Sequence, residues 1–204
     1  MVADDHPLFR QAMVMAASTV APQARIVEAA TLDSAVLASA ASDLILMLLD
    51  LKMPGSAGYS GVALLHAERP SVPILVVSSA QAQIAGPEAR RYGAVGFIGK
   101  DQDLETIEQA IAAALAGDAP PVPPPPVNDA VDDMAGKVAS LTPTQLRVLL
   151  GVLDGQLNKQ IAYELGVAES TIKSHMTIVL SKLGVQNRTQ AALAARALGL
   201  QPRD

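Results

Sequence analysis

The stretch that decides the fold of the front half of this chain is Asp43–Asp50, which reads DLILMLLD. The apolar residues Leu44–Leu49 follow one another without interruption between the two aspartates. A run that is apolar on both faces predicts a strand in the middle of a sheet that is covered by helices on both sides. Because Asp50 directly follows the run, we expect its carboxylate at the carboxyl end of that strand.

The segments on either side of this run alternate between short apolar stretches and amphipathic stretches with helical spacing. The expected strands are a short segment before Asp4, then Arg25–Ala29, Leu44–Leu49, Ile74–Val77 and Val95–Ile98. The expected helices are Leu8–Val20, Leu32–Ala40, Ser60–Glu68, Gln81–Tyr92 and Asp103–Ala116. This alternation predicts a doubly wound α/β domain with a parallel sheet, in which ligands bind beyond the carboxyl ends of the strands.

The composition excludes several classes of protein. The chain has 204 residues, of which 50% are hydrophobic and 17% are charged, and it contains no cysteine. Long disordered regions, disulfides and thiolate metal sites are therefore excluded. No stretch of about 18 apolar residues is present, and the first residues lack the basic-then-apolar pattern of a signal peptide. We expect a cytoplasmic protein that does not enter a membrane.

A proline-rich segment separates the chain into two parts. Six of the fourteen prolines lie in Pro120–Pro126, and several acidic residues follow them. Proline fixes φ and lacks the N–H donor, so an extended spacer with an acidic end is expected. We predict a front domain over residues 1–117, a linker over 118–139 and a rear domain over 140–204.

The charges are distributed unevenly between the two parts. Residues 1–119 contain 7 Lys and Arg residues and 13 Asp and Glu residues, whereas residues 140–204 contain 7 Lys and Arg residues and 4 Asp and Glu residues. The excess of positive charge in the rear part allows it to bind a polyanion.

Polar residues follow four of the expected strands of the front domain. Asp4 and Asp5 follow the first, Asp50 follows the central run, Ser79 comes after Ile74–Val77, and Lys100 comes after Val95–Ile98. In a parallel sheet these ends meet at one edge, where three carboxylates repel one another unless a cation neutralises them. Mg²⁺ prefers oxygen ligands of this kind, and with one ammonium and one hydroxyl the set can handle a phosphoryl group. Each residue alone is more typical of a helix cap or a turn.

Four segments of the front domain resemble the receiver domain of bacterial two-component response regulators. They are DDHPLFR (Asp4–Arg10), LLDLKMPG (Leu48–Gly55), SSA (Ser78–Ala80) and GFIGK (Gly96–Lys100). The resemblance covers about residues 1–117 and implies a flavodoxin-like fold. It also implies that a sensor histidine kinase transfers a phosphoryl group to Asp50.

The same resemblance implies roles for the remaining residues at the sheet edge. Asp5, Asp50 and the main-chain carbonyl of Lys52 hold Mg²⁺, while Asp4 assists through water. Ser79 and Lys100 contact the phosphoryl oxygens. Phe97 matches the aromatic residue whose rotamer changes with activation in this family, although an ordinary core ring is an equally good interpretation.

Two features depart from the family pattern. Only Met1, Val2 and Ala3 precede Asp4, a length of about 10 Å at most, whereas receiver domains have five or six strand residues there. We expect that an upstream piece is absent from the given sequence; a loosened or altered receiver is the alternative. The loop that follows Pro54 is also a few residues longer than usual in the family, and it borders the expected pocket.

The rear domain is helical by its sequence pattern. Four helices are expected: one capped by Thr142 with Pro143 in its first turn, one capped by Asn158 and ending at Gly166, one from Glu169 or Ser170 to Leu183, and one capped by Thr189. A short helix, a glycine turn and a longer helix make a helix-turn-helix pattern. By pattern alone, a helical bundle that binds another protein is nearly as good an interpretation.

The rear domain resembles the LuxR-type (NarL/FixJ) helix-turn-helix domain over about residues 140–200. The matching segments are LTPTQLRVL (Leu141–Leu149), LNKQIAYELGVAESTIKSHM (Leu157–Met176), KLGV (Lys182–Val185) and NRTQAA (Asn187–Ala192). The resemblance implies that the third helix enters the major groove of DNA. Base contacts are then expected from Lys173, Ser174 and Thr177, and phosphate contacts from Lys159, Thr171, Lys182 and Arg188.

Together these features predict a transcriptional response regulator that is not an enzyme. We expect a homodimer on a pseudo-palindromic operator, because one unit with few basic residues binds DNA weakly. The alternative is a pseudo-receiver transcription factor, whose front domain only binds proteins and does not depend on phosphorylation. A hydrolytic phosphatase on the same sheet is disfavoured, because Leu51 and Lys52 follow Asp50 where a further acid–base carboxylate is needed.

Overall fold

The computed structural model describes residues 1–79, 82–118 and 129–201, and the chain forms two compact units, Met1–Pro126 and Val127–Asp204. The first unit contains a five-stranded sheet in the order β2-β1-β3-β4-β5, and all of its neighbouring strands are parallel. Its strands are β1 (Val2–Ala3), β2 (Glu28–Ala29), β3 (Met47–Asp50), β4 (Ile74–Ser78) and β5 (Ala94–Gly99). The predicted doubly wound α/β fold is confirmed.

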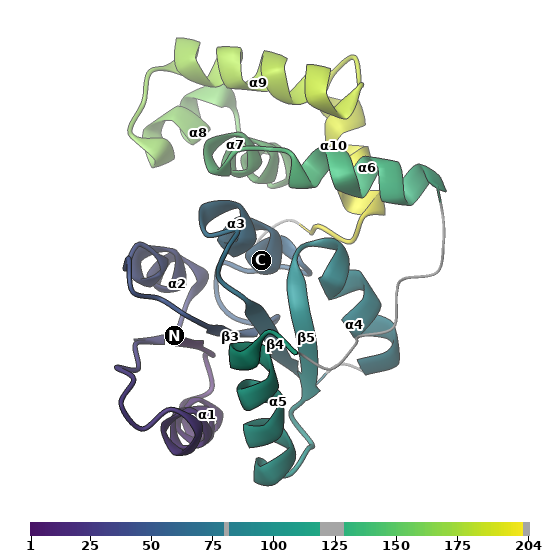
Figure 1. The fold of residues 1–204 in the computed structure, drawn as a ribbon. Helices are drawn as coiled ribbons and strands as arrows, with labels where there is room; N and C mark the ends of the chain where they lie inside the picture. Colours follow the sequence, from purple (N-terminus) through teal and green to yellow (C-terminus); the bar gives the residue numbers. More distant parts are fainter. Residues whose placement is uncertain (80–81, 119–128, 202–204) are drawn as a thin grey trace. The chain divides into compact units, whose positions relative to one another are not determined.

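In the described part of this unit, five helices cover the two faces of the sheet (Figure 1). Helices α1 (Pro7–Val20) and α5 (Leu104–Ala116) pack side by side on one face. Helices α2 (Leu32–Ser39), α3 (Ser60–Glu68) and α4 (Ala82–Arg91) lie on the other face. The sheet is thus covered by two helical layers, and ligands can reach it at the carboxyl ends of its strands.

The core between the sheet, α1 and α5 consists of aliphatic side chains. Leu48 and Leu75 of the central strands contact a cluster that includes Met13 of α1 and Ile111 of α5, and all four are at most 2% exposed. Their strand neighbours point to the opposite face, because side chains alternate along a strand. This packing of aliphatic residues on both faces explains how a chain with so few aromatic residues forms a stable sheet.

Two strands are shorter than the sequence predicts. β3 begins at Met47 rather than Leu44, and β2 consists of Glu28–Ala29 only. A strand needs a neighbour to satisfy its backbone groups. Met47 pairs with Ile74, the first residue of β4, and Val2 and Ala3 of β1 pair with Leu48 and Leu49, so the ladder starts only there. Leu46 is buried although it lies outside the strand.

Residues 129–201 of the second unit contain the four predicted helices and one more. Its elements are α6 (Asp129–Ala139), α7 (Pro143–Leu153), α8 (Asn158–Leu165), α9 (Glu169–Leu183) and α10 (Arg188–Ala197). The extended conformation that we expected for the acidic end of the linker is wrong at residues 129–139. There α6 buries Ala135 and Val138 and packs against α9, because these apolar residues recur at helical spacing. The proline run itself lies outside the described residues, and the predicted domain limits stay a prediction.

The helix-turn-helix pattern is confirmed in α8 and α9. Gly166 ends α8 with a φ of 65°, a left-handed conformation that favours glycine. Thr142 caps α7 with Pro143 in the first turn, as predicted. Two cap predictions are wrong by one or two residues: Leu157 precedes α8, and Asn187 rather than Thr189 accepts the N-cap hydrogen bond of α10. Among the helices in the described part of the chain, none is long and apolar enough to cross a membrane.

Candidate functional site

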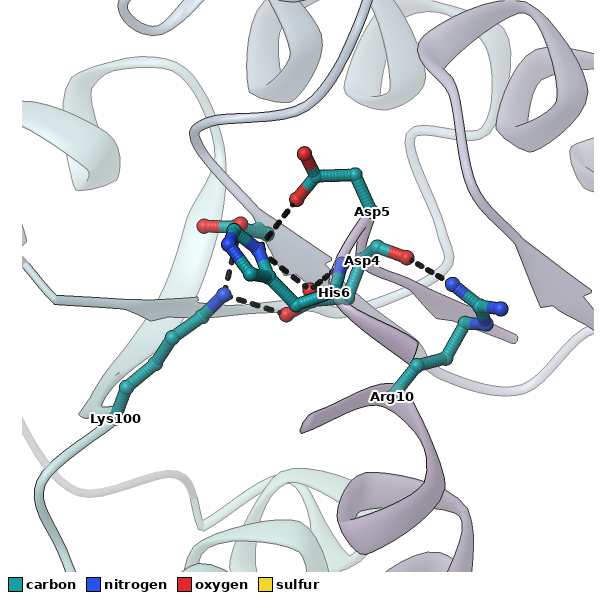
Figure 2. A network of polar contacts seen from close by, with 6 residues as sticks. Asp4, Asp5, His6, Arg10 and Lys100 are labelled. Carbon is teal, nitrogen blue, oxygen red and sulfur yellow. Dashed lines mark hydrogen bonds and ion pairs between the residues drawn. The ribbon is translucent and has the colours of Figure 1, made fainter. Parts of the chain in front are cut away.

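The polar residues that follow the strands of the first unit meet at one edge of the sheet. Asp4 follows β1, Asp50 is the last residue of β3, and Lys100 follows β5. The backbone N–H of Lys100 donates to the carbonyl of Ser78 at 2.9 Å, which extends the β4–β5 pairing to the start of the Lys100 side chain. Figure 2 shows the side chains of Asp4, Asp5, His6 and Lys100 directed toward one another. The predicted convergence is confirmed for Asp4, Asp5, Asp50 and Lys100.

A half-buried lysine lies between two buried carboxylates in this cluster. Lys100 Nζ is 2.6 Å from Asp4 Oδ2 and 2.8 Å from Asp50 Oδ2. The side chains of Asp4 and Asp50 are only 3% and 2% exposed, and that of Lys100 is 15% exposed. The ammonium also lies 4.7 Å from the centre of the Phe9 ring, a cation–π distance. Lys100 therefore neutralises the carboxylates that the sheet forces together.

The pKa values in the cluster reflect burial and this pairing. Burial raises the pKa of the Asp50 carboxyl above its ordinary value, although hydrogen bonds from the Lys100 ammonium and the Lys52 backbone oppose the shift. Burial lowers the pKa of Lys100, but its hydrogen bonds with Asp4 and Asp50 outweigh that effect and raise it overall. The ammonium thus stays protonated at neutral pH.

The cluster also has the donors and the size of a cation site. One ligand atom from each of Asp4, Asp5, His6 and Asp50 can be chosen so that all lie within 4.8 Å of one another. Opposite ligands of Mg²⁺ are about 4 Å apart, since each metal–oxygen distance is about 2.1 Å. Carboxylate oxygens are the ligands that Mg²⁺ prefers, so the residues present fit this ion.

A pocket of about 420 Å³ opens beside the cluster. Asp50 and Lys100 form part of its wall, and the exposed residues Lys52 and Ser79 line it as well. Both had been predicted near the site from the sequence. Phe97 is not among the residues that line this pocket: it is half-buried within β5, where its register partner is Val76. Its role as a switch residue stays a prediction.

Three neighbours of the cluster were missed by the sequence reasoning. The His6 side chain is 70% exposed, but its Nδ1 lies 2.7 Å from Asp5 Oδ1. Phe9 contacts the Lys100 ammonium. Arg10 donates from Nη1 to the Asp4 carbonyl at 2.7 Å (Figure 2). The signal that could have revealed Phe9 and Arg10 is their place in the first turn and a half of α1, which begins two residues after the acidic pair.

The second unit presents one polar face of α9 to solvent. Ile172, Met176, Val179 and Leu183 of this helix are buried, because they recur at helical spacing on one face. Lys173, Ser174 and Thr177 are exposed on the other side. Lys173 Nζ is 3.0 Å from Glu169 Oε1 one turn earlier, an exposed pair that a polyanion can displace at little cost.

The predicted phosphate-contacting residues fall into two groups. Lys159 and Thr171 are exposed near the amino-terminal ends of α8 and α9. Lys182 and Arg188 are half-buried and already donate to backbone carbonyls, Lys182 to Ser140 at 2.8 Å and Arg188 to Gln156 at 2.7 Å. These two side chains therefore brace the helices of the domain whether or not they also contact DNA.

Comparison with known families agrees with both units. Residues 1–112 match the response regulator receiver domain, and residues 139–195 match the bacterial regulatory proteins of the LuxR family. The chain belongs to the LuxR-family response regulators. The chain is thus a DNA-binding transcription regulator with a receiver domain, and its family consists of regulators rather than enzymes. Receiver domains usually bind Mg²⁺ at an acidic cluster, and this structure contains such a cluster.

Relatives of this response regulator align along most of its length. The glycerol metabolism activator of Pseudomonas putida is 39% identical over 96% of this chain and 93% of the relative. The nitrate/nitrite response regulator protein NarL of Escherichia coli strain K12 is 30% identical over 95% of this chain and 92% of its own. Among solved structures, the receiver domain of a NarL response regulator from Mycobacterium tuberculosis is 31% identical, with a TM-score of 0.51 over 57% of this chain and 94% of that structure.

Proposed function

We propose that this response regulator is switched by transfer of a phosphoryl group from a sensor histidine kinase to Asp50. The observation that carries the proposal is the pairing of Asp50 with Lys100 in the wall of the pocket. Asp50 is a buried carboxylate at the end of a central strand, it borders a pocket of about 420 Å³, and an ammonium is 2.8 Å from one of its oxygens. An ionisable oxygen beside a fixed cation is suited to accept a phosphoryl group.

Asp5, Asp50 and the main-chain carbonyl of Lys52 would hold Mg²⁺ at this edge, with Asp4 assisting through water. When bound, the ion neutralises charge on the phosphoryl oxygens. The donor set supports this assignment, since Asp4, Asp5 and Asp50 supply carboxylate oxygens within 4.8 Å of one another.

In the transfer step, one oxygen of the Asp50 carboxylate attacks the phosphorus of a phosphohistidine on the kinase. The phosphorus–nitrogen bond breaks as the acyl phosphate bond forms, and the histidine nitrogen leaves with the electron pair. Lys100 and Ser79, which line the same pocket, would donate to the phosphoryl oxygens. Movement of Ser79 with Phe97 would then pass the change to the rest of the receiver.

The output is binding of DNA by the second unit. Lys173, Ser174 and Thr177 on the exposed face of α9 would contact base edges in the major groove. Lys159 and Thr171, together with Lys182 and Arg188 where their backbone bonds allow, would contact phosphates. We further propose a cytoplasmic homodimer on a pseudo-palindromic operator, because one unit carries few cations and phosphate contacts dominate affinity.

Labelling with acetyl phosphate in the presence of Mg²⁺ tests the acceptor. Asp50→Asn should abolish the incorporation of phosphate into the protein, while Asp43→Asn should not change it. Asp43 is a matched control because it precedes the same apolar run but is 73% exposed and remote from the pocket. Incorporation retained by Asp50→Asn contradicts the assignment of the acceptor.

A DNA-binding titration tests the output. Duplexes selected from a random pool are titrated at two salt concentrations, with and without acetyl phosphate. We expect affinity to increase on phosphorylation in the wild type and not in Asp50→Asn. Equal affinities in both states would instead favour a pseudo-receiver, whose DNA binding does not depend on phosphorylation.

A further inference from the structure

Arg10 connects the acidic pair to the edge of the sheet. It lies in α1, and its side chain is only 18% exposed. Nη1 donates to the main-chain carbonyl of Asp4 at 2.7 Å, and Nε donates to Glu28 Oε2 of β2 at 3.0 Å. One guanidinium thus contacts two elements, the end of β1 and the strand β2 beside it (Figure 2 shows the contact with Asp4).

The Asp4 carbonyl is the oxygen of the peptide that joins Asp4 to Asp5. The preceding peptide, between Ala3 and Asp4, is held by the sheet, since the Asp4 N–H donates to the Ala29 carbonyl at 3.0 Å. Arg10 then holds the carbonyl of the next peptide, and the plane of that peptide sets where the Cα of Asp5 lies. Asp5 lies two residues beyond Ala3, the last residue of β1, and is not a member of either strand pairing of β1. The contact from Arg10 on the preceding carbonyl, together with His6 Nδ1 at 2.7 Å from Asp5 Oδ1, therefore orients Asp5.

Two further hydrogen bonds hold the rest of this loop. The His6 N–H donates to Asp4 Oδ1 at 2.8 Å, and the Arg10 N–H donates to the His6 carbonyl at 2.9 Å. The backbone of α1 and the side chain of Arg10 thus hold the loop Asp4–His6 from two sides.

We propose that Arg10 is a positioning residue for the cation site, with Glu28 holding the guanidinium in place. This inference rests on the proposed function and adds a residue that touches neither the cation nor the phosphoryl group. Mg²⁺ demands near-ideal octahedral geometry, so a small rotation of Asp5 costs affinity. Removal of partners that orient metal ligands typically lowers metal affinity about 10- to 100-fold.

The electrostatic effect of Arg10 has the opposite sign, which makes the proposal testable. As a cation near the carboxylates, Arg10 repels Mg²⁺, so its removal strengthens Mg²⁺ binding if charge is all that matters. If Arg10 only stabilises the fold, its removal lowers the free energy of unfolding and leaves Mg²⁺ affinity unchanged. Positioning alone predicts weaker Mg²⁺ binding.

The experiment measures Mg²⁺ affinity of the full chain by isothermal titration calorimetry, and the free energy of unfolding in urea without Mg²⁺. We expect about 10-fold weaker Mg²⁺ binding in Arg10→Met. Arg10→Lys keeps the charge but has no planar fork to reach both acceptors, so an intermediate loss is expected. Glu28→Gln keeps an acceptor for Nε and should bind nearly as the wild type does, whereas Glu28→Ala should lose affinity.

Arg25→Met is the matched control. Arg25 also pairs with a carboxylate, Asp43, but at 3.9 Å with both side chains more than 70% exposed. Mg²⁺ affinity that is unchanged or increased in Arg10→Met overturns the proposal, as does an equal loss in Arg25→Met. Should Arg10→Met fail to fold, Arg10→Lys and Glu28→Ala decide the same question.

Labelling with acetyl phosphate separates this inference from the proposed function. In Arg10→Met the Mg²⁺ concentration for half-maximal labelling should rise about 10-fold, while the rate at saturating Mg²⁺ stays close to the wild type. A wild type that labels, together with an Arg10→Met variant of unchanged Mg²⁺ midpoint, rejects the positioning role and leaves the function standing. A wild type that does not label rejects the function, and the calorimetric affinities still decide the role of Arg10.

Discussion

Replacement of Lys100 by Met should destabilise the receiver unit at neutral pH through the two carboxylates that it leaves behind. In the wild type the Lys100 ammonium is 2.6 Å from Asp4 Oδ2 and 2.8 Å from Asp50 Oδ2, and both aspartates are almost fully buried. Removal of one partner from a buried ion pair costs about 3–5 kcal/mol. The site opens onto a pocket from which water screens the charges, so we expect a loss of about 2–3 kcal/mol.

The assay is urea unfolding followed by circular dichroism, in which the receiver transition is recognised as the one that Mg²⁺ shifts. Mg²⁺ should restore most of the stability of Lys100→Met, because the ion takes over the neutralising role of the ammonium. Lower pH should also reduce the deficit, since protonation of Asp50 removes one of the repelling charges. Arg25→Met, which breaks an exposed pair, is the control and should change little.

A deficit below about 1 kcal/mol would refute the argument that Lys100 neutralises these buried carboxylates. A loss of unfolding free energy of about 2–3 kcal/mol that Mg²⁺ does not reduce would show that the carboxylates do not form the cation site.

Three further predictions concern other parts of the chain. Burial lowers the pKa of His66 below its ordinary value. As the pH falls through about 6.5, the unfolded chain therefore takes up a proton before the folded receiver does, and the urea midpoint of the receiver should decrease. In His66→Phe this part of the pH dependence should vanish. Thr142→Ala removes the hydroxyl that accepts from the Gln145 N–H at the start of α7 and should cost about 1 kcal/mol in urea unfolding, whereas Thr144→Ala, inside the same helix, should be milder. Lys159→Met should lower the slope of log affinity against log salt by about 0.9 for any duplex, and an unchanged slope would exclude a phosphate contact at this residue.

Much of the site could be predicted from the sequence because the parallel sheet has strong local signals. Asp50 directly follows an unbroken apolar run and Lys100 follows Gly99, so both positions at the sheet edge follow from hydrophobic pattern and strand direction alone. Glycine is also a strong local signal for the end of a helix, since Gly166 and Gly184 end α8 and α9 with a positive φ. The sequence did not predict α6, because a neighbouring proline run and clustered acids masked the helical spacing of Ala135 and Val138.

The sequence by itself determined the order of the elements, the helix-turn-helix and the residue types at the strand ends, since each depends on periodicity, turn chemistry or chain direction. Only the tertiary structure decided where strands begin, because a strand exists only beside a partner: β3 starts at Met47, opposite the first residue of β4. It alone also revealed the contacts of Arg10 with the Asp4 carbonyl and with Glu28 of β2. A long side chain on a helix can reach several backbone groups, and which of them it contacts depends on how α1 packs against the sheet.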